Sequence, residues 1–82
     1  MELRSFEEFR KEVLRRLKEN ESNWKAQAKT FEEYIKNNNA ENFINSEYKW
    51  YKSPLHLKTV TLTPERYFNY SVSTAISNIE MS

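Results

Sequence analysis

The chain has 82 residues, enough for one small domain, and its 13 basic and 12 acidic residues give a net charge of +1. It contains no cysteine, which excludes disulfides and thiolate chemistry, and no glycine, which excludes the usual glycine-rich phosphate loop. The charge balance is too even to indicate a nucleic-acid-binding protein by composition alone, so any binding charge must come from local patterning.

The first predicted helix begins after Ser5 and ends near Asn20. Ser5 is a favoured N-cap, and Glu8 three residues later completes the capping-box pattern. Apolar residues follow at helical spacing and form one stripe: Phe6, Phe9, Val13, Leu14 and Leu17. Because the chain has no glycine, Asn20 is expected to end this helix in a left-handed conformation.

A second helix is expected from about residue 22 or 23 to about residue 37, antiparallel to the first. Its apolar residues would share one face: Trp24, Ala28, Phe31 and Ile35. Thr30 and Glu33 repeat the capping-box pattern of the first helix. This repeat offers a rival helix start at Thr30, which would leave residues 23–29 as a separate turn.

The segment 40–53 is ambiguous from sequence, since its apolar residues fit a helical face but its aromatic end, 47–52, also suits a strand. Pro54 disfavours helical conformation at Ser53, so either element would stop there. The next segment, LHLKTVTLT at 55–63, is β-branched and partly alternating, which is typical of a strand. Because a lone strand leaves its backbone groups unpaired, we expect 47–52 to pair with 55–62 as a hairpin.

The last element is predicted to be a helix. Thr63 is a suitable N-cap, Pro64 suits the first helical position, and Glu65 lies in the first turn. Its apolar stripe consists of Phe68, Val72, Ala75, Ile76 and Ile79. The expected core draws on all three helices: Phe9, Leu17, Phe31, Ile35, Phe68, Val72 and Ile79.

The fold class expected from these elements is α+β and mostly helical, one domain over residues 1–82 in the order α-α-β-β-α with a small antiparallel hairpin. The alternative is an all-α bundle with an extended arm at 54–62.

Residues suited to catalysis or metal binding are scarce. The one histidine, His56, has no carboxylate beside it in the sequence that could orient it as a general base. One histidine without cysteine or aspartate is also a poor basis for a metal site. We therefore expect no enzymatic activity, no catalytic residues, no metal and no cofactor.

The segment SEYKWYKSPLHLK at 46–58 is the best candidate for a binding surface. Aromatic and basic side chains are interleaved along it, and both kinds are common at contacts with proteins and with nucleic acids. Arg10 is added because it interrupts the apolar stripe of the first helix. The expected partner-binding residues are Tyr48, Lys49, Trp50, Tyr51, Lys52, His56, Lys58 and Arg10. A secondary basic stripe lies along the first helix: Arg4, Lys11, Arg15 and Lys18.

The function expected from these features is non-enzymatic binding of another protein, as a small adaptor or inhibitor, by a monomer or a homodimer. The alternative is binding of nucleic acid through 48–58 and the basic stripe. The first residues lack the apolar core of a signal peptide, and no apolar run is long enough to span a membrane. We therefore expect a cytoplasmic protein with no membrane partner. Its size resembles that of accessory and phage-encoded proteins, which is an analogy only.

Overall fold

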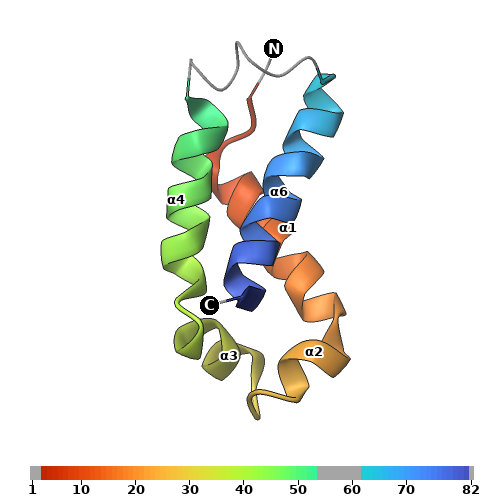
Figure 1. The fold of residues 1–82 in the computed structure, drawn as a ribbon, viewed down its shortest axis with the longest axis vertical. Coiled ribbons are helices and arrows are strands. Elements are labelled where there is room, and N and C mark those ends of the chain that lie inside the picture. Colours follow the sequence, from red (N-terminus) through yellow and green to blue (C-terminus); the bar gives the residue numbers. More distant parts are fainter. Residues whose placement is uncertain (1–2, 54–61, 82) are drawn as a thin grey trace.

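The computed structural model describes residues 3–53 and 62–81, and all regular structure in these residues is helical. The helices are α1 (Phe6–Glu19), α2 (Glu21–Lys25), α3 (Phe31–Asn37), α4 (Ala40–Lys52) and α6 (Pro64–Met81). Figure 1 shows α4 and α6 side by side and antiparallel, with α1 crossing behind them and α2 and α3 closing the lower end.

The prediction of an α+β fold is wrong, because residues 47–52 are the last turns of α4 and not a strand. Ala40, Ile44 and Tyr51 recur at helical spacing along α4, and all three are buried. Burying this stripe requires the whole segment to be helical. The residues 47–52 alone are too few to show the helical repeat of the stripe. The second predicted strand, 55–62, and the arm of the all-α alternative, 54–62, lie outside the described residues except for Leu62.

The end of α4 follows the expectation from Pro54. The helix ends at Lys52, and Ser53 takes an extended conformation with φ −62° and ψ 125°. That conformation is the one favoured for a residue that precedes proline.

The N-terminal cap of α1 is confirmed, since the Ser5 hydroxyl accepts a hydrogen bond from the Glu8 N–H at 3.3 Å. The left-handed conformation predicted for Asn20 is wrong: its φ is −88° and its N–H binds the Leu17 carbonyl. The chain turns directly into α2 at this point, so no left-handed residue is needed. Among the described residues, positive φ in a non-glycine residue occurs at Asn39, with φ 53°, between α3 and α4.

The single second helix predicted for about 22–37 is wrong, because the segment forms α2 and α3 with a break between them. The rival start at Thr30 is confirmed, since its hydroxyl accepts from the Glu33 N–H at 3.1 Å. The Glu33 carboxylate accepts in turn from the Lys29 N–H at 3.2 Å. Thr30 therefore caps α3 and breaks the segment in two.

The helix predicted at the C-terminal end is confirmed as α6, and the Thr63 hydroxyl accepts from the Arg66 N–H at 3.3 Å. Of the expected core, Phe31 and Ile35 are only partly buried, while the other five members are buried. Three tyrosines that the sequence analysis left out of the core are almost fully enclosed: Tyr34, Tyr51 and Tyr67. The Tyr67 hydroxyl donates to the Tyr51 carbonyl at 2.6 Å, which ties α6 to the end of α4.

Candidate functional site

The segment predicted to bind a partner is divided by the helical geometry of α4. Tyr51 points into the core and is 1% exposed, whereas its neighbour Trp50 is 57% exposed. The Tyr51 ring stacks on Tyr67, with the ring centroids 5.1 Å apart, and on Phe9 at 5.5 Å. Tyr51 is therefore a core residue and does not belong to the exposed surface of this segment.

Tyr48 lies on the flank of α4 that faces α1. Its ring packs edge-on against Phe6 with the centroids 5.2 Å apart, and its hydroxyl donates to the Arg4 carbonyl at 3.0 Å. Burial is the main cause that raises the pKa of the Tyr48 hydroxyl above its usual value. The Lys52 ammonium lies 5.2 Å from the centre of the Tyr48 ring. Tyr48 and Lys52 thus serve the packing of α4 on α1, away from Trp50.

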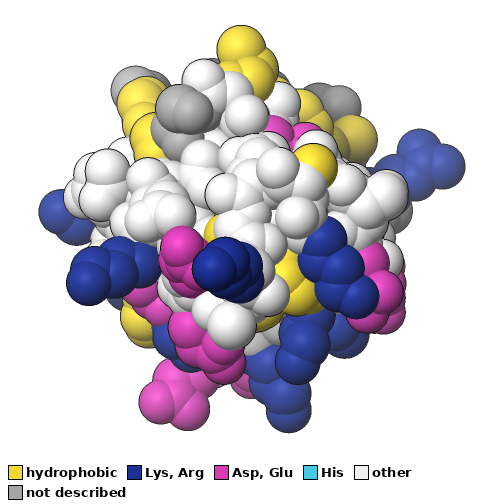
Figure 2. All heavy atoms as spheres, turned by 90° about the horizontal axis from the view of Figure 1, so that it is seen from below, with side chains coloured by type: hydrophobic (Ala, Val, Ile, Leu, Met, Phe, Trp, Pro, Cys, Tyr) yellow, Lys and Arg dark blue, Asp and Glu magenta, His cyan; other side chains and the backbone are white. Residues whose placement is uncertain are grey.

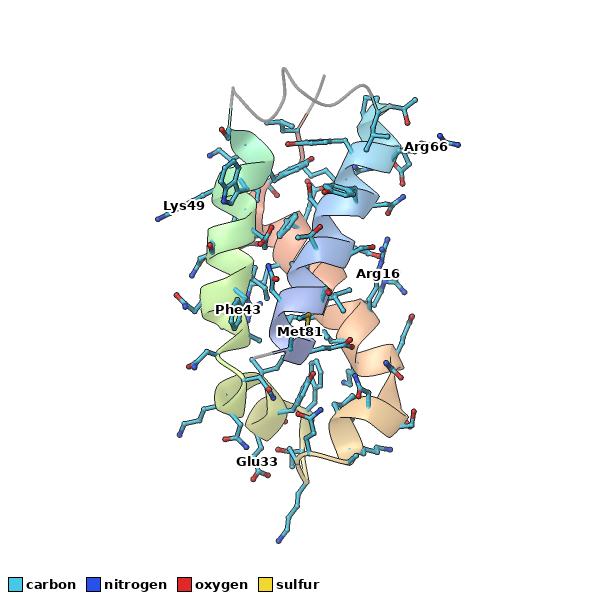
Figure 3. All side chains as sticks on the ribbon, viewed as in Figure 1. Arg16, Glu33, Phe43, Lys49, Arg66 and Met81 are labelled. Atoms are coloured by element: carbon cyan, nitrogen blue, oxygen red, sulfur yellow. The ribbon has the colours of Figure 1, made fainter. Side chains whose placement is uncertain are left out.

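Of the remaining predicted residues of this segment, Lys49 borders Trp50, since the two line a small hollow with Ser53. Lys49 is exposed, and Figure 3 shows it extending from α4 away from α6. His56 and Lys58 lie outside the described residues.

The arginines among the predicted binding residues and the predicted basic stripe are paired with glutamates of the same chain. Nε of Arg10 donates to both carboxylate oxygens of Glu41 at 2.9 Å, and these hydrogen bonds raise the pKa of the guanidinium. Arg4 donates to Glu65 at 2.8 Å, and Arg15 binds Glu12. The guanidiniums are therefore held by intramolecular contacts, which lowers the positive charge that this side of α1 offers to a phosphate backbone.

The two lysines of the stripe, Lys11 and Lys18, are exposed, and neither forms an ion pair with another residue of the described part. They lie on α1, where most of the other charged side chains form ion pairs within the chain. Figure 2 views the end formed by α2 and α3, where several basic side chains lie next to one another at the lower right and acidic side chains lie at the lower left.

The largest exposed apolar side chains in the described residues are Trp50, Tyr70 and Met81, at 57%, 53% and 82%. Helical spacing places Trp50 on the flank of α4 that carries Phe43 and Glu47, and this flank faces α6. The same spacing places Tyr70, Thr74 and Met81 on one side of α6. We call this surface the α4–α6 face, and it consists of Phe43, Glu47, Trp50, Tyr70, Thr74 and Met81.

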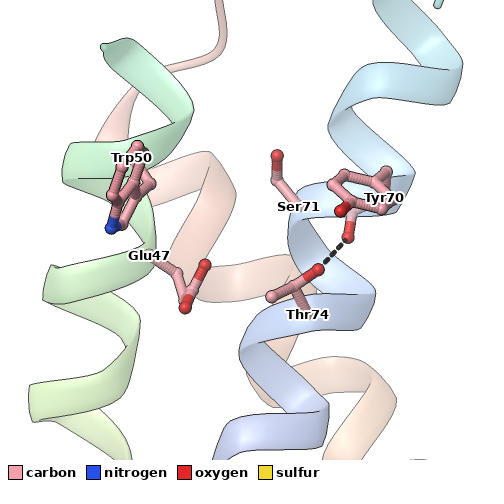
Figure 4. A pocket seen from close by; sticks show the side chains of 5 residues that line it. All are labelled: Glu47, Trp50, Tyr70, Ser71 and Thr74. Carbon is pink, nitrogen blue, oxygen red and sulfur yellow. Dashed lines mark hydrogen bonds between the residues drawn. The ribbon is translucent and has the colours of Figure 1, made fainter. Parts of the chain in front are cut away.

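A shallow hollow of about 230 Å³ lies in the upper part of this face. It is lined by Glu47, Trp50, Tyr70, Ser71 and Thr74, and Figure 4 shows these side chains between the two helices. The Glu47 carboxylate accepts a hydrogen bond from the Asn78 amide, which joins α4 to α6 beneath the hollow. The Thr74 hydroxyl donates to the Tyr70 carbonyl at 3.0 Å. These contacts hold the walls of the hollow in place.

The α4–α6 face differs in charge from the rest of the chain. The sequence of α6 has no charged residue between Arg66 and Glu80, whereas α1 is charged along most of its length. Depletion of charge together with exposed aromatic and methionine side chains is the composition of an interface centre. Tyr70, Met81 and Glu47 were missing from the sequence-based prediction. The uncharged run 67–79 was a signal that could have indicated Tyr70, whereas Glu47 and Met81 lie outside it.

Other kinds of site find little support in the described part of the chain. In residues 3–53 and 62–81 no group of three or more His, Cys, Asp or Glu is arranged to hold a metal ion. Within the same ranges, no helix combines the length and the apolar character needed to cross a membrane. Comparison with protein-family models, with curated proteins and with solved structures finds no significant match to this chain.

Proposed function

We propose that this chain is a non-enzymatic protein-binding module, acting as a small adaptor or inhibitor in the cytoplasm, and that the α4–α6 face contacts its partner protein. The observation that carries the proposal is the exposure of Trp50, Tyr70 and Met81 on one face. Fully exposing an aromatic side chain forfeits about 2 kcal/mol of burial energy. A domain this small has a low net stability, so this loss is a substantial part of it.

The aromatic residues favour a protein partner over nucleic acid. Trp and Tyr are the residues that most often dominate the energy of protein interfaces. Binding to nucleic acid depends instead on cations free to contact phosphates, and Arg4, Arg10 and Arg15 are engaged with glutamates. Nucleic-acid binding is therefore the less favoured function, and the experiment below includes an outcome that would reveal it.

The experiment compares two adjacent α4 residues that face different ways. A partner protein captured from the native host would be purified, and its Kd measured for the parent, Trp50→Ala, Tyr70→Ala and Lys49→Ala. We expect Trp50→Ala and Tyr70→Ala each to raise Kd at least tenfold, about 1.4 kcal/mol, because each removes an aromatic anchor. Both variants should keep the parent melting temperature within a few degrees, because both residues are exposed.

Lys49→Ala is the matched control, since Lys49 borders Trp50 on the same helix but its side chain extends away from α6. It should leave Kd within about twofold, because an exposed charge at the rim of a contact contributes little. Equal losses from Lys49→Ala and Trp50→Ala would overturn the proposed surface. Binding of labelled oligonucleotides that falls steeply with salt, without any effect of Trp50→Ala, would favour nucleic acid instead.

A further inference from the structure

The hollow on the α4–α6 face combines two aromatic rings with one carboxylate. Trp50 belongs to α4 and Tyr70 to α6, and both side chains are more than half exposed. Figure 4 shows the two rings on opposite sides of the hollow, with the Glu47 side chain directed from α4 toward α6. The face of an aromatic ring attracts cations, and a carboxylate attracts them as well. We propose that this hollow receives an arginine side chain of the partner protein, an inference that rests on the proposed function and names the chemistry of the contact.

The charges around the hollow favour a cation over an anion. Glu47 is the one charged residue among the five described residues that line it. Two basic residues close to it in the sequence, Lys49 and Arg66, do not line it, and Figure 3 shows their side chains extending away on opposite sides of α4 and α6. An acidic side chain in the hollow would therefore be repelled by Glu47, whereas a basic one would be attracted.

The chain makes the same kind of contact with its own cations. Cζ of Arg4 lies 4.1 Å from the centre of the Phe68 ring, and Nζ of Lys52 lies 5.2 Å from the centre of the Tyr48 ring. In the part of the chain that the structure describes, no lysine or arginine lies over the Tyr70 ring in this way. The 53% exposed Tyr70 side chain is therefore accessible to a cation of another molecule.

Arginine suits the hollow better than lysine does. A guanidinium is planar, so it can stack on an aromatic ring while it donates to a carboxylate, and it is less strongly hydrated than an ammonium. The Glu47 carboxylate is already oriented by the hydrogen bond from the Asn78 amide. The hollow measures about 230 Å³, whereas sites for drug-sized ligands measure about 300–1,000 Å³. Its size is therefore that of a site for the end of one side chain.

The test titrates the whole chain with N-acetyl-arginine amide and follows the indole N–H signals of its two tryptophans by nuclear magnetic resonance. We expect the Trp50 signal to shift saturably. The Trp24 signal is the internal control and should stay in place, because its N–H donates to the Lys18 carbonyl at 3.0 Å and the side chain is buried. N-acetyl-citrulline amide has nearly the same shape without the charge, and it should bind at least fivefold more weakly. The corresponding lysine amide should bind at least threefold more weakly than arginine.

Variants of the hollow separate its charge from its apolar surface. Glu47→Gln keeps an oxygen that can accept from Asn78 but removes the charge, so it should weaken the arginine probe at least fivefold. Tyr70→Leu keeps apolar surface but removes the ring and should weaken the probe similarly, whereas Tyr70→Phe should stay within about twofold of the parent. Glu19→Gln removes the same charge from an exposed position on α1 and should leave binding unchanged. Thermal melts of each variant establish that it folds.

The outcomes distinguish this inference from the proposed function. The absence of a saturable shift with the arginine probe, equal binding of the citrulline probe, or indifference to Glu47→Gln would each overturn the inference. Tighter binding of the lysine probe would overturn the choice of arginine. A captured partner protein that is weakened by Trp50→Ala but not by Glu47→Gln would overturn the arginine contact and leave the proposed function standing. A partner indifferent to Trp50→Ala, with the arginine probe bound as expected, would overturn the proposed function and leave the affinity of the hollow for arginine.

Discussion

Glu12 is the residue on which two guanidiniums converge. Nε of Arg15 donates to its carboxylate at 3.2 Å and Nε of Arg16 at 2.8 Å. Hydrogen bonding from Arg15 is the largest cause that lowers the pKa of Glu12 from 4.5 to about 2, and Arg16 adds to it. A depressed pKa means that this carboxylate stabilises the fold fully above pH 4.5 and progressively less as the pH falls toward 2.

We therefore expect Glu12→Gln to lower the free energy of unfolding at pH 7 by about 1–2 kcal/mol, a value reduced for solvent screening of the exposed arginine. The difference from the parent should shrink toward zero as the pH falls to 2 and below, because the parent carboxylate is protonated in that range as well. Urea unfolding at the two pH values measures both effects. Glu19→Gln is the control, because Glu19 is 64% exposed and should cost less than about 0.5 kcal/mol. Equal stability of Glu12→Gln and the parent at pH 7 would contradict the assignment.

At the scale of single residues, the sequence indicated which side chains matter but not which way they face. Trp50 and Tyr51 are adjacent and chemically alike, and only the phase of α4 separates an exposed ring from a buried one. Arg10 was singled out as a contact residue because it interrupts an apolar stripe. Its partner, Glu41, is 31 residues away, and sequence rules detect only pairs within one helix.

Among the elements, α6 depends on its first turn because its many serines give it weak helical propensity. Thr63→Ala removes the hydroxyl that accepts from the Arg66 N–H, so the free energy of unfolding should fall by about 1 kcal/mol. Amide exchange in residues 65–67 should quicken, which nuclear magnetic resonance would detect. Thr74→Ala makes the same substitution inside α6 and should cost less than about 0.5 kcal/mol, because alanine is the better helix former there. Unchanged exchange in Thr63→Ala would show that the cap contributes nothing.

The elements that the sequence predicted well are those with a local start signal. Ser5, Thr30 and Thr63 each begin a helix, and each hydroxyl accepts from the N–H three residues later. The errors arose where local rules conflict. Residues 47–52 suit a strand by composition, and their helical state follows from burying Ile44 and Tyr51 on one side.

For the whole molecule, the core rests on an aromatic cluster shared by α1, α4 and α6. Phe68 is 6% exposed, and its ring lies 6.1 Å from that of Phe9 and 6.0 Å from that of Tyr51. Phe68→Ala should cost about 3–5 kcal/mol, a large share of the roughly 4–12 kcal/mol expected for a chain of this length. Met81→Ala, on the same helix, should cost less than about 0.5 kcal/mol because Met81 is exposed. Similar denaturation midpoints for these two variants would contradict the docking of α6.

The candidate surface could be predicted from the sequence only in part, because it depends on how two helices pack in the whole molecule. Trp50 was identified from its own segment, but Tyr70 and Met81 join it only because α4 and α6 lie side by side. That pairing brings together residues about 20 or more positions apart, and no periodicity within one helix encodes it.

The turn at Asn39 bears on the unfolded chain as well as on the folded one. Holding a non-glycine residue at φ 53° costs about 1–2 kcal/mol, less for asparagine than for most residues. A glycine there would remove that strain, but it would also give the unfolded chain more conformations to lose, an opposing effect of about 0.4–1 kcal/mol. The turn thus gains little from glycine. A chain without any glycine starts from a narrower unfolded ensemble, so a core of this modest size has less conformational entropy to overcome.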